Sequence, residues 1–243
     1  MLYNILAIGD VVGGCGVSCL ERHLRAVKKL KNIHFTVVNG ENAAMVGLTP
    51  NDAERIFSAG ADVITLGNHS FGKMQITDYL DDCPYILRPH NLGARVPGRG
   101  YGVFDCGRAR IAVMNLIGRC DLAFHADNPF KTADELLKSG EKPTFTLLDF
   151  HAEATSEKLA MAYYLDGRVS AIWGTHTHVP TADEEVFPKG TGYLTDLGMT
   201  GAVRSVLGIK PEQSVETFLG GLPGRYREPE KSVGKMQGAI FTL

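Results

Sequence analysis

The chain has 243 residues, of which 44% are hydrophobic and 21% charged, and its formal net charge at pH 7 is -2. This ordinary globular composition is enough for one large or two modest hydrophobic cores, and no apolar segment approaches the length of a membrane span. A net charge so close to zero argues against a large nucleic-acid interface, though not against a nucleotide substrate.

The first third of the chain alternates predicted strands and helices. A loop is expected over residues 11–16, and apolar residues at spacings of three and four then predict a helix over 17–30. A second helix is expected after Thr49, which fits an N-cap, with Pro50 at its first position and Gly60 at its end. Apolar runs predict strands around these helices at residues 3–8, 34–38 and 62–66.

The rest of the chain contains more strands, with one helix expected over residues 156–165. The further predicted strands are 85–87, 101–105, 110–116, 144–150, 169–173, 192–195 and 238–243. Early βαβ units followed by strand-rich sequence indicate an α/β protein with more than one sheet. No Pro/Ser-rich linker, charge block or internal repeat divides the chain, so residues 1–243 are expected to form a single domain.

The five cysteines indicate the redox compartment. Their number is odd and no Cys-x-x-Cys pair occurs, which is typical of reduced thiols in a cytoplasmic protein. The first ten residues contain an apolar run, but neither a basic segment nor a small-residue cleavage site, so they do not resemble a signal peptide.

Residues 169–180, VSAIWGTHTHVP, contain the strongest local indication of a site. A short apolar strand runs into Gly174 and then into a Thr-His-Thr-His turn. Because side chains on extended backbone alternate between two faces, His176 and His178 are expected to point the same way and Thr177 the other. Imidazole is the commonest transition-metal ligand, so this pair could serve one metal ion or two adjacent ones.

Polar side chains also follow four other predicted strands. In chain order, the strand-end groups are Asp10, Glu41 with Asn42, Asn68 with His69, His151, and His176 with His178. In open α/β sheets, ligands bind outside the carboxyl ends of the strands. Taken singly, each residue is more often an ordinary turn or core residue. Five consecutive groups of acids, amides and imidazoles nevertheless predict a shared metal site.

These motifs resemble those of the calcineurin-like metallophosphoesterases. They read Gly9-Asp10, Gly40-Glu41-Asn42, Gly67-Asn68-His69, His151 and Gly174-Thr175-His176-Thr177-His178. Two departures, Val12 at a usual histidine and Glu41 at a usual aspartate, mark the YmdB-type phosphodiesterases. The resemblance to that branch covers nearly the whole chain, through NGENAA (39–44), ITLGNH (64–69), PGRGY (97–101), DFHAEATSEK (149–158), GTHTH (174–178), TADE (181–184) and TDLGMTG (195–201).

The resemblance implies an α/β/β/α sandwich of two mostly parallel or mixed β-sheets flanked by helices. It also implies a dinuclear-metal enzyme that hydrolyses cyclic nucleotides, notably 2',3'-cyclic ones. The family pattern places Asp10, Asn42 and His178 on one metal and Asn68, His151 and His176 on the other, with Glu41 bridging them. Such oxygen and nitrogen ligands suit iron or manganese, which the resemblance favours, with magnesium as a further option.

In the expected mechanism, the metals lower the pKa of a bridging water so that hydroxide attacks phosphorus in line. His69 is the candidate for protonating the leaving ribose oxygen or stabilising charge on the phosphoryl oxygens, a role that the resemblance supports. The segment Ser70-Phe71-Gly72 and Arg204 depart from the YmdB-type pattern. These departures are expected to affect substrate preference more than metal binding. Arg99, Arg119 and Arg204 are candidates to hold a phosphate or a base, although surface or ion-pair roles are commoner.

Other functions are compatible with parts of the sequence. A phosphomonoesterase or phosphoprotein phosphatase would use the same dimetal core, and a non-catalytic metal-dependent signalling protein would keep the fold. A dinucleotide-binding oxidoreductase is suggested by the first strand and Gly-rich turn, but residues 14–19 read GxGxxC and lack the third glycine. The expected partner is a small cyclic nucleotide or other phosphoester, without a membrane. The oligomeric state is left open, a homo-oligomer included.

Overall fold

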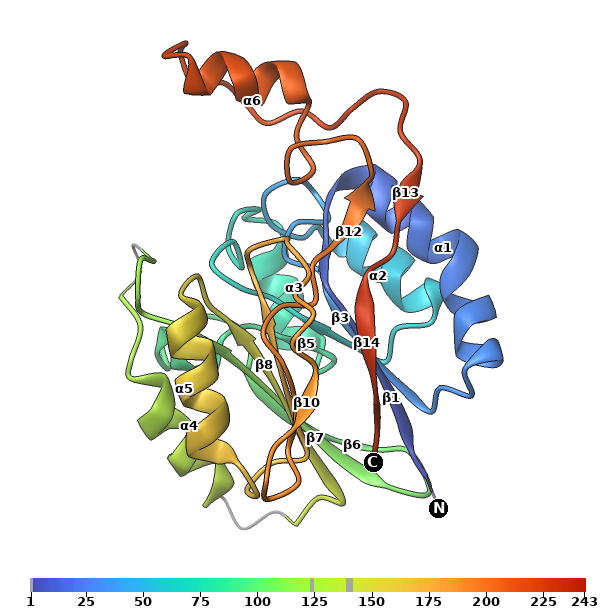
Figure 1. Cartoon of the computed structure of the whole chain (residues 1–243), viewed down its shortest axis with the longest axis vertical. Helices are drawn as coiled ribbons and strands as arrows, with labels where there is room; N and C mark the ends of the chain where they lie inside the picture. The colour runs from blue at the N-terminus through green and yellow to red at the C-terminus, as the bar shows by residue number, and fades with distance from the viewer. Residues whose placement is uncertain (1, 123–124, 139–141) are drawn as a thin grey trace.

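The computed structural model of the protein describes residues 2–122, 125–138 and 142–243. Two large β-sheets lie against each other, and helices cover the outer face of each sheet (Figure 1). The first and last strands of the chain lie side by side, so the two termini are close together (Figure 1).

The first sheet has the strand order β14-β1-β3-β4-β5. Strands β1, β3, β4 and β5 run parallel, and β14 pairs antiparallel with β1 at the edge. Its strands are β1 (Asn4–Ile8), β3 (Phe35–Asn39), β4 (Val63–Thr65), β5 (Ile86–Leu87) and β14 (Gly238–Thr242). The helices that cover it are α1 (Gly13–Leu30), α2 (Pro50–Ala59) and α3 (Ile76–Asp82).

The second sheet has the strand order β10-β11-β9-β8-β7-β6. Its four central strands run parallel, and β10 and β6 pair antiparallel at the two edges. Its strands are β6 (Tyr101–Asp105), β7 (Arg110–Ile117), β8 (Phe145–His151), β9 (Ala171–Thr175), β10 (Glu185–Val186) and β11 (Gly192–Leu194). The helices α4 (Pro129–Leu137) and α5 (Thr155–Leu165) cover it, and a short 3-10 helix, η1 (His90–Leu92), precedes β6.

The hydrophobic core forms three layers, one between the sheets and one under each set of helices. Strand β1 shows why: Ile5 and Ala7 face the second sheet, whereas Leu6 and Ile8 face the helices. Successive side chains on a strand point to opposite faces, so a parallel strand buried on both faces reads as an unbroken apolar run. The α/β/β/α sandwich expected from the sequence is therefore confirmed, and the strands expected from apolar runs lie within two residues of their predicted positions.

The loop predicted over residues 11–16 is wrong. Asp10–Val11 form a short strand, β2, and α1 begins at Gly13. Gly16 is a packing residue of this helix, because a Cβ there would lie 2.3 Å from the carbonyl oxygen of Thr200. Strand β2 joins a third, small sheet that the sequence did not predict, with β12 (Met199–Ala202) and β13 (Gly234–Lys235).

Helix α6 (Pro211–Phe218), also not predicted, lies on an arm that extends from the two-sheet body at the top of Figure 1. The backbone of this arm leaves β12 and returns at β13. Within the described residues, no helix has both the length and the apolar composition needed to cross a bilayer.

Candidate metal centre

The eight residues predicted from the strand ends come together at one place. The elements that carry them are β2 (Asp10), the loop after β3 (Glu41 and Asn42), the loop after β4 (Asn68 and His69), the last residue of β8 (His151) and the loop after β9 (His176 and His178). Loops from both sheets thus contribute to one site at the carboxyl ends of the parallel strands.

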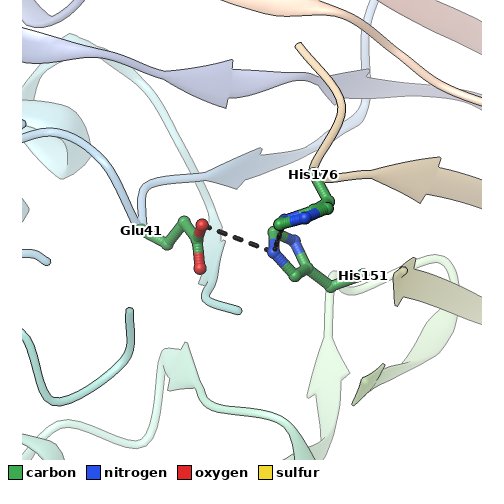
Figure 2. A group of neighbouring side chains, drawn as sticks. All are labelled: Glu41, His151 and His176. Atoms are coloured by element: carbon green, nitrogen blue, oxygen red, sulfur yellow. Dashed lines mark hydrogen bonds and ion pairs between the residues drawn. The ribbon is translucent and has the colours of Figure 1, made fainter. Parts of the chain in front are cut away.

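One group of ligand atoms surrounds His151. Figure 2 shows Glu41, His151 and His176 pointing toward one another, and one ligand atom from each lies within 4.8 Å of the others. Nε2 of His151 is 3.3 Å from Oε1 of Glu41, 3.0 Å from Nδ1 of His176 and 2.8 Å from Oδ1 of Asn68. Because His151 and Glu41 are almost fully buried, these contacts lie in a region of low dielectric.

A second group surrounds Asp10. Nε2 of His178 is 3.8 Å from Oδ1 of Asp10 and 3.2 Å from Nδ2 of Asn42. The same Asn42 amide donates to Oε1 of Glu41 at 3.0 Å. Glu41 therefore contacts both groups and lies between them.

The backbone after β9 is bent, so the predicted alternation of an extended strand is wrong here. His176 and His178 both have positive φ, of 104° and 64°, a region that non-glycine residues rarely occupy. Between them, the backbone N–H and hydroxyl of Thr177 donate to Oδ2 of Asp196 at 3.2 and 2.8 Å. The turn places Thr177 toward Asp196, Nε2 of His178 beside Asp10, and Nε2 of His176 3.0 Å from Oε2 of Glu153 in the loop after β8.

Hydrogen bonds on the far side of each ring orient two of the histidines. The Thr175 hydroxyl donates to Asp149 at 2.7 Å, so its oxygen accepts from Nδ1 of His151, 2.9 Å away. Nδ1 of His178 likewise donates to the carbonyl oxygen of Leu207 at 3.2 Å. Each ring is held through Nδ1 with Nε2 directed into the site, which is how protein scaffolds usually orient metal-binding histidines.

The charges of the site favour one positive charge at His151. Burial alone would lower the pKa of His151, but the charge and hydrogen bond of Glu41 and the charge of Asp10 raise it to about 9. Burial alone would raise the pKa of Glu41, yet interactions with His151 and His69 lower it to about 2. Burial, followed by the charge on His151, lowers the pKa of His176 to about 3. One positive charge is thus stabilised here by the buried carboxylates.

Three observations fit a bound metal. Oδ1 of Asp10 is buried and, among the described residues, has no hydrogen-bond partner, although buried carboxylate oxygens normally have one. Gly67 leaves space beside the ligand atoms, since a Cβ there would lie 2.2 Å from Oε2 of Glu41 and 2.3 Å from Nε2 of His151. The donors are carboxylate and amide oxygens and imidazole nitrogens, which suit iron, manganese or magnesium.

His69 lies beside both groups in a cavity of about 390 Å³. Its backbone N–H donates to Oε2 of Glu41 at 3.2 Å, and its Nε2 is 3.2 Å from the Asn68 amide. Arg99, Arg119 and Arg204 are exposed, and none of them is among the described residues that line this cavity. Ser70 closes the Gly67–Ser70 turn through a hydroxyl bond of 2.6 Å to the Gly67 carbonyl, so its departure from the family pattern is accommodated within the loop.

Sequence reasoning missed the residues that support the candidate ligands. Asp149 lies inside the buried strand β8 and accepts from Thr175, and Lys158 on α5 is buried against Asp196 at 2.8 Å. At Asp149 the available signal was a charged residue inside an apolar run, because such residues are rarely buried without a partner. Lys158 follows Ser156 and Glu157 in a polar stretch and gave no such signal. Nothing in the sequence pattern identified which partner each would take.

The dinucleotide-binding alternative receives no support from the start of α1. The N-terminus of a helix after a Gly-rich turn is where such proteins hold a pyrophosphate. Here the carboxylate of Glu228 accepts from the backbone N–H of Cys15 at 3.1 Å, and a Cβ at Gly13 would lie 2.5 Å from that carboxylate. A carboxylate of the chain itself occupies this anion-binding position.

The chain forms a four-layer α/β/β/α sandwich, and one carboxylate lies between two groups of oxygen and imidazole donors at the strand ends. These features define a protein of the metallophosphoesterase class. The model of the YmdB-like protein family matches residues 6–243. The chain belongs to this family, which confirms the resemblance found in the sequence.

Individual relatives agree with this assignment. The chain is 46% identical over 229 residues to the 2',3'-cyclic-nucleotide 2'-phosphodiesterase of Bacillus subtilis (strain 168), covering 93% of this chain and 86% of the relative. A crystal structure of a novel phosphatase from Mycoplasma pneumoniae has a TM-score of 0.92 at 34% identity, covering 100% of this chain and 88% of that one. A hypothetical protein from Thermus thermophilus has a TM-score of 0.88 at 34% identity, with 99% of both chains covered.

Proposed function

We propose that the protein is a metal-dependent phosphodiesterase that hydrolyses 2',3'-cyclic nucleotides. The observation that carries the proposal is the pair of connected donor groups that share the buried Glu41 carboxylate at one cavity. The name of the Bacillus subtilis relative supports the choice of a cyclic nucleotide.

The proposed ligand set follows the two groups of contacts. Asp10, Asn42 and His178 would hold one ion, Asn68, His151 and His176 the other, and Glu41 both. Iron or manganese is the proposed metal, with magnesium as the further option. When bound, two divalent ions would supply an activated water and neutralise charge on the phosphoryl oxygens.

The residues of the chain set the charge of the site. Asn42 and Asn68 are neutral, so Asp10 and Glu41 are the carboxylates of the proposed ligand set, and two divalent ions would leave this set with a net positive charge. That surplus attracts a monoanionic diester. His69 points into the same cavity without belonging to either ligand group, so we assign it the proton transfer to the leaving ribose oxygen.

We further propose a cytoplasmic location. All five cysteines are free in the structure, and reduced thiols are typical of cytosolic proteins. This agrees with the odd cysteine count in the sequence.

The test is metal analysis of the purified protein, followed by hydrolysis of 2',3'-cyclic AMP, 3',5'-cyclic AMP and 4-nitrophenyl phosphate. We expect two metal ions per chain and fastest turnover of the 2',3'-cyclic diester. The His69→Ala variant should keep both ions and lose about 10²- to 10⁴-fold in kcat.

Other outcomes would select the alternatives. Faster hydrolysis of the monoester would indicate a phosphomonoesterase, in line with the Mycoplasma pneumoniae phosphatase. Bound metal without turnover of any of the three compounds would favour a non-catalytic metal-dependent protein. A His69→Ala variant with the wild-type rate would remove the role assigned to His69.

A further inference from the structure

The cavity at the proposed metal centre is lined by two chemically different sets of residues. One set is polar and includes Glu41, His69 and His176. The other set, here called the apolar wall, includes Met45, Val46, Leu207, Ile209 and Tyr226. A charged phosphate group does not bind favourably to apolar surface. The wall therefore indicates that the ligand has an apolar part beside its phosphate.

The backbone around this cavity is held in unusual conformations. Six non-glycine residues in the described part of the chain have positive φ, and four of them, Met45, His176, His178 and Leu207, line the cavity. Such conformations persist only where the surrounding structure enforces them, and they concentrate at functional sites. Met45 and Leu207 of the wall are therefore constrained in the same way as His176 and His178.

Leu207 is fixed relative to the metal centre by a tight turn. Val206 and Ile209 exchange two backbone hydrogen bonds, of 2.9 and 3.0 Å. Gly208 packs so closely in this turn that a Cβ would lie 2.4 Å from Cγ1 of Val12. The Leu207 carbonyl accepts from His178, so the same turn orients a proposed metal ligand and forms one end of the apolar wall.

Tyr226 is positioned by Gln213 of helix α6. The Gln213 side chain donates to the Arg225 carbonyl at 2.9 Å and accepts from the Arg227 N–H at 3.1 Å. The backbone N–H of Lys210 donates to the Arg227 carbonyl at 2.8 Å. The residues on both sides of Tyr226 are thereby tied to the arm, while Tyr226 itself lines the cavity with 53% of its surface exposed.

We propose that the apolar wall is the subsite for the nucleobase of the substrate, with the ring of Tyr226 stacked on the base. This inference rests on the proposed function, because the base is the aromatic part of a cyclic nucleotide. The side chains of the wall are aliphatic apart from the Tyr226 ring and its hydroxyl, so they offer little to distinguish one base from another. Stacking accepts every base, since each has a π-face, and we expect purine and pyrimidine 2',3'-cyclic nucleotides to be hydrolysed with similar KM.

The experiment compares 2',3'-cyclic AMP with ribose 2',3'-cyclic phosphate, which lacks the base. The metal-loaded wild-type protein should have a KM for the nucleotide about tenfold or more below that for the base-free compound. Tyr226→Ala should remove most of this preference, and Tyr226→Phe should retain it. Tyr163→Ala serves as the matched control, because Tyr163 is an exposed tyrosine on α5 that does not line the cavity.

The outcomes separate this inference from the proposed function. Equal KM values for the two compounds in the wild-type protein, or an undiminished preference in Tyr226→Ala, would overturn the base subsite while leaving the phosphodiesterase intact. Hydrolysis of neither compound by the metal-loaded wild type would overturn the proposed function, and the subsite with it.

Discussion

At the scale of single residues, the site depends on the absence of one side chain. The α-carbon of Gly67 approaches the ligand atoms of both Glu41 and His151, and no side chain fits between them. The conformation of Gly67 is within the range of other residues, since it is not among the glycines with positive φ. Gly67 therefore matters because it leaves room beside Glu41 and His151 at the proposed metal centre.

Gly67→Ala should lose metal and activity while the protein still folds. The new Cβ would lie 2.2 Å from Oε2 of Glu41, so we expect less than two ions per chain and a fall in kcat/KM on the order of 100-fold. Metal analysis and steady-state kinetics measure both. Gly224→Ala is the control, because its Cβ would meet nothing closer than Nε2 of Gln213 at 3.7 Å. Full metal content and a wild-type rate in Gly67→Ala would contradict this account.

Residues differ in how far the sequence reveals their role. The eight strand-end residues could be predicted because a polar group directly after an apolar run stands out, and because parallel strands bring their carboxyl ends to one edge. Thr175 and Asp149 could not, since their roles depend on which side chains become neighbours across β8 and β9. Tyr226 gave no signal, because it lies among polar residues on an arm whose course only the structure shows.

At the scale of elements, helix α5 is linked by a buried ion pair to the segment after β11, and through it to the turn after β9. Nζ of Lys158 lies 2.8 Å from Oδ2 of Asp196, and both side chains are almost fully buried. The same Asp196 oxygen accepts from Thr177, between the two histidines. Gly174 in β9 makes room for this arrangement, because a Cβ there would lie 2.7 Å from Cδ of Lys158.

Lys158→Met should destabilise the protein strongly, since it leaves the Asp196 carboxylate buried without its cation. Loss of one partner from a buried pair costs about 3–5 kcal/mol, which the free energy of unfolding in urea would show. The double variant Lys158→Met/Asp196→Asn should be more stable than Lys158→Met alone, because it removes both charges. Lys210→Met is the control: Lys210 pairs with the exposed Glu230, and we expect a change below about 1 kcal/mol. Equal effects of the two lysine substitutions would show that the buried pair does not stabilise the fold.

Regular elements were predicted well where both faces of a strand are buried. The runs that became β1, β3, β7 and β8 are mostly apolar, because each packs on the other sheet and on helices. The third sheet was missed for the opposite reason, since β2, β12 and β13 are two to four residues long and gain their pairing from distant segments. Close packing of Gly16 on β12 likewise made the start of α1 look like a loop.

At the scale of the whole molecule, the proposed metal centre joins the two large sheets. Glu41 and Asn68 come from loops of the first sheet, Asp10 from the short strand β2 that follows β1, and His151 and His176 from the second sheet. Below the site, the sheets contact each other through an apolar layer that includes Trp173 and Phe35. Metal ligands drawn from both sheets would therefore add a link at the open edge of the sandwich, where polar groups replace the apolar layer.

Removal of the metal should consequently lower the temperature of unfolding. A ligand that binds only the folded state stabilises it by about 2.7 kcal/mol at 100 times its Kd, and each kcal/mol corresponds to about 2–4 °C in a chain of this size. We expect chelation to reduce Tm by about 5–10 °C and added manganese to restore it, measured by scanning calorimetry. Gly67→Ala, in which a Cβ fills the space beside Glu41 and His151, should show little shift in either direction. The same Tm with and without metal in the wild-type protein would mean that the folded structure does not hold the ions, because a ligand that binds only the folded state must raise the Tm.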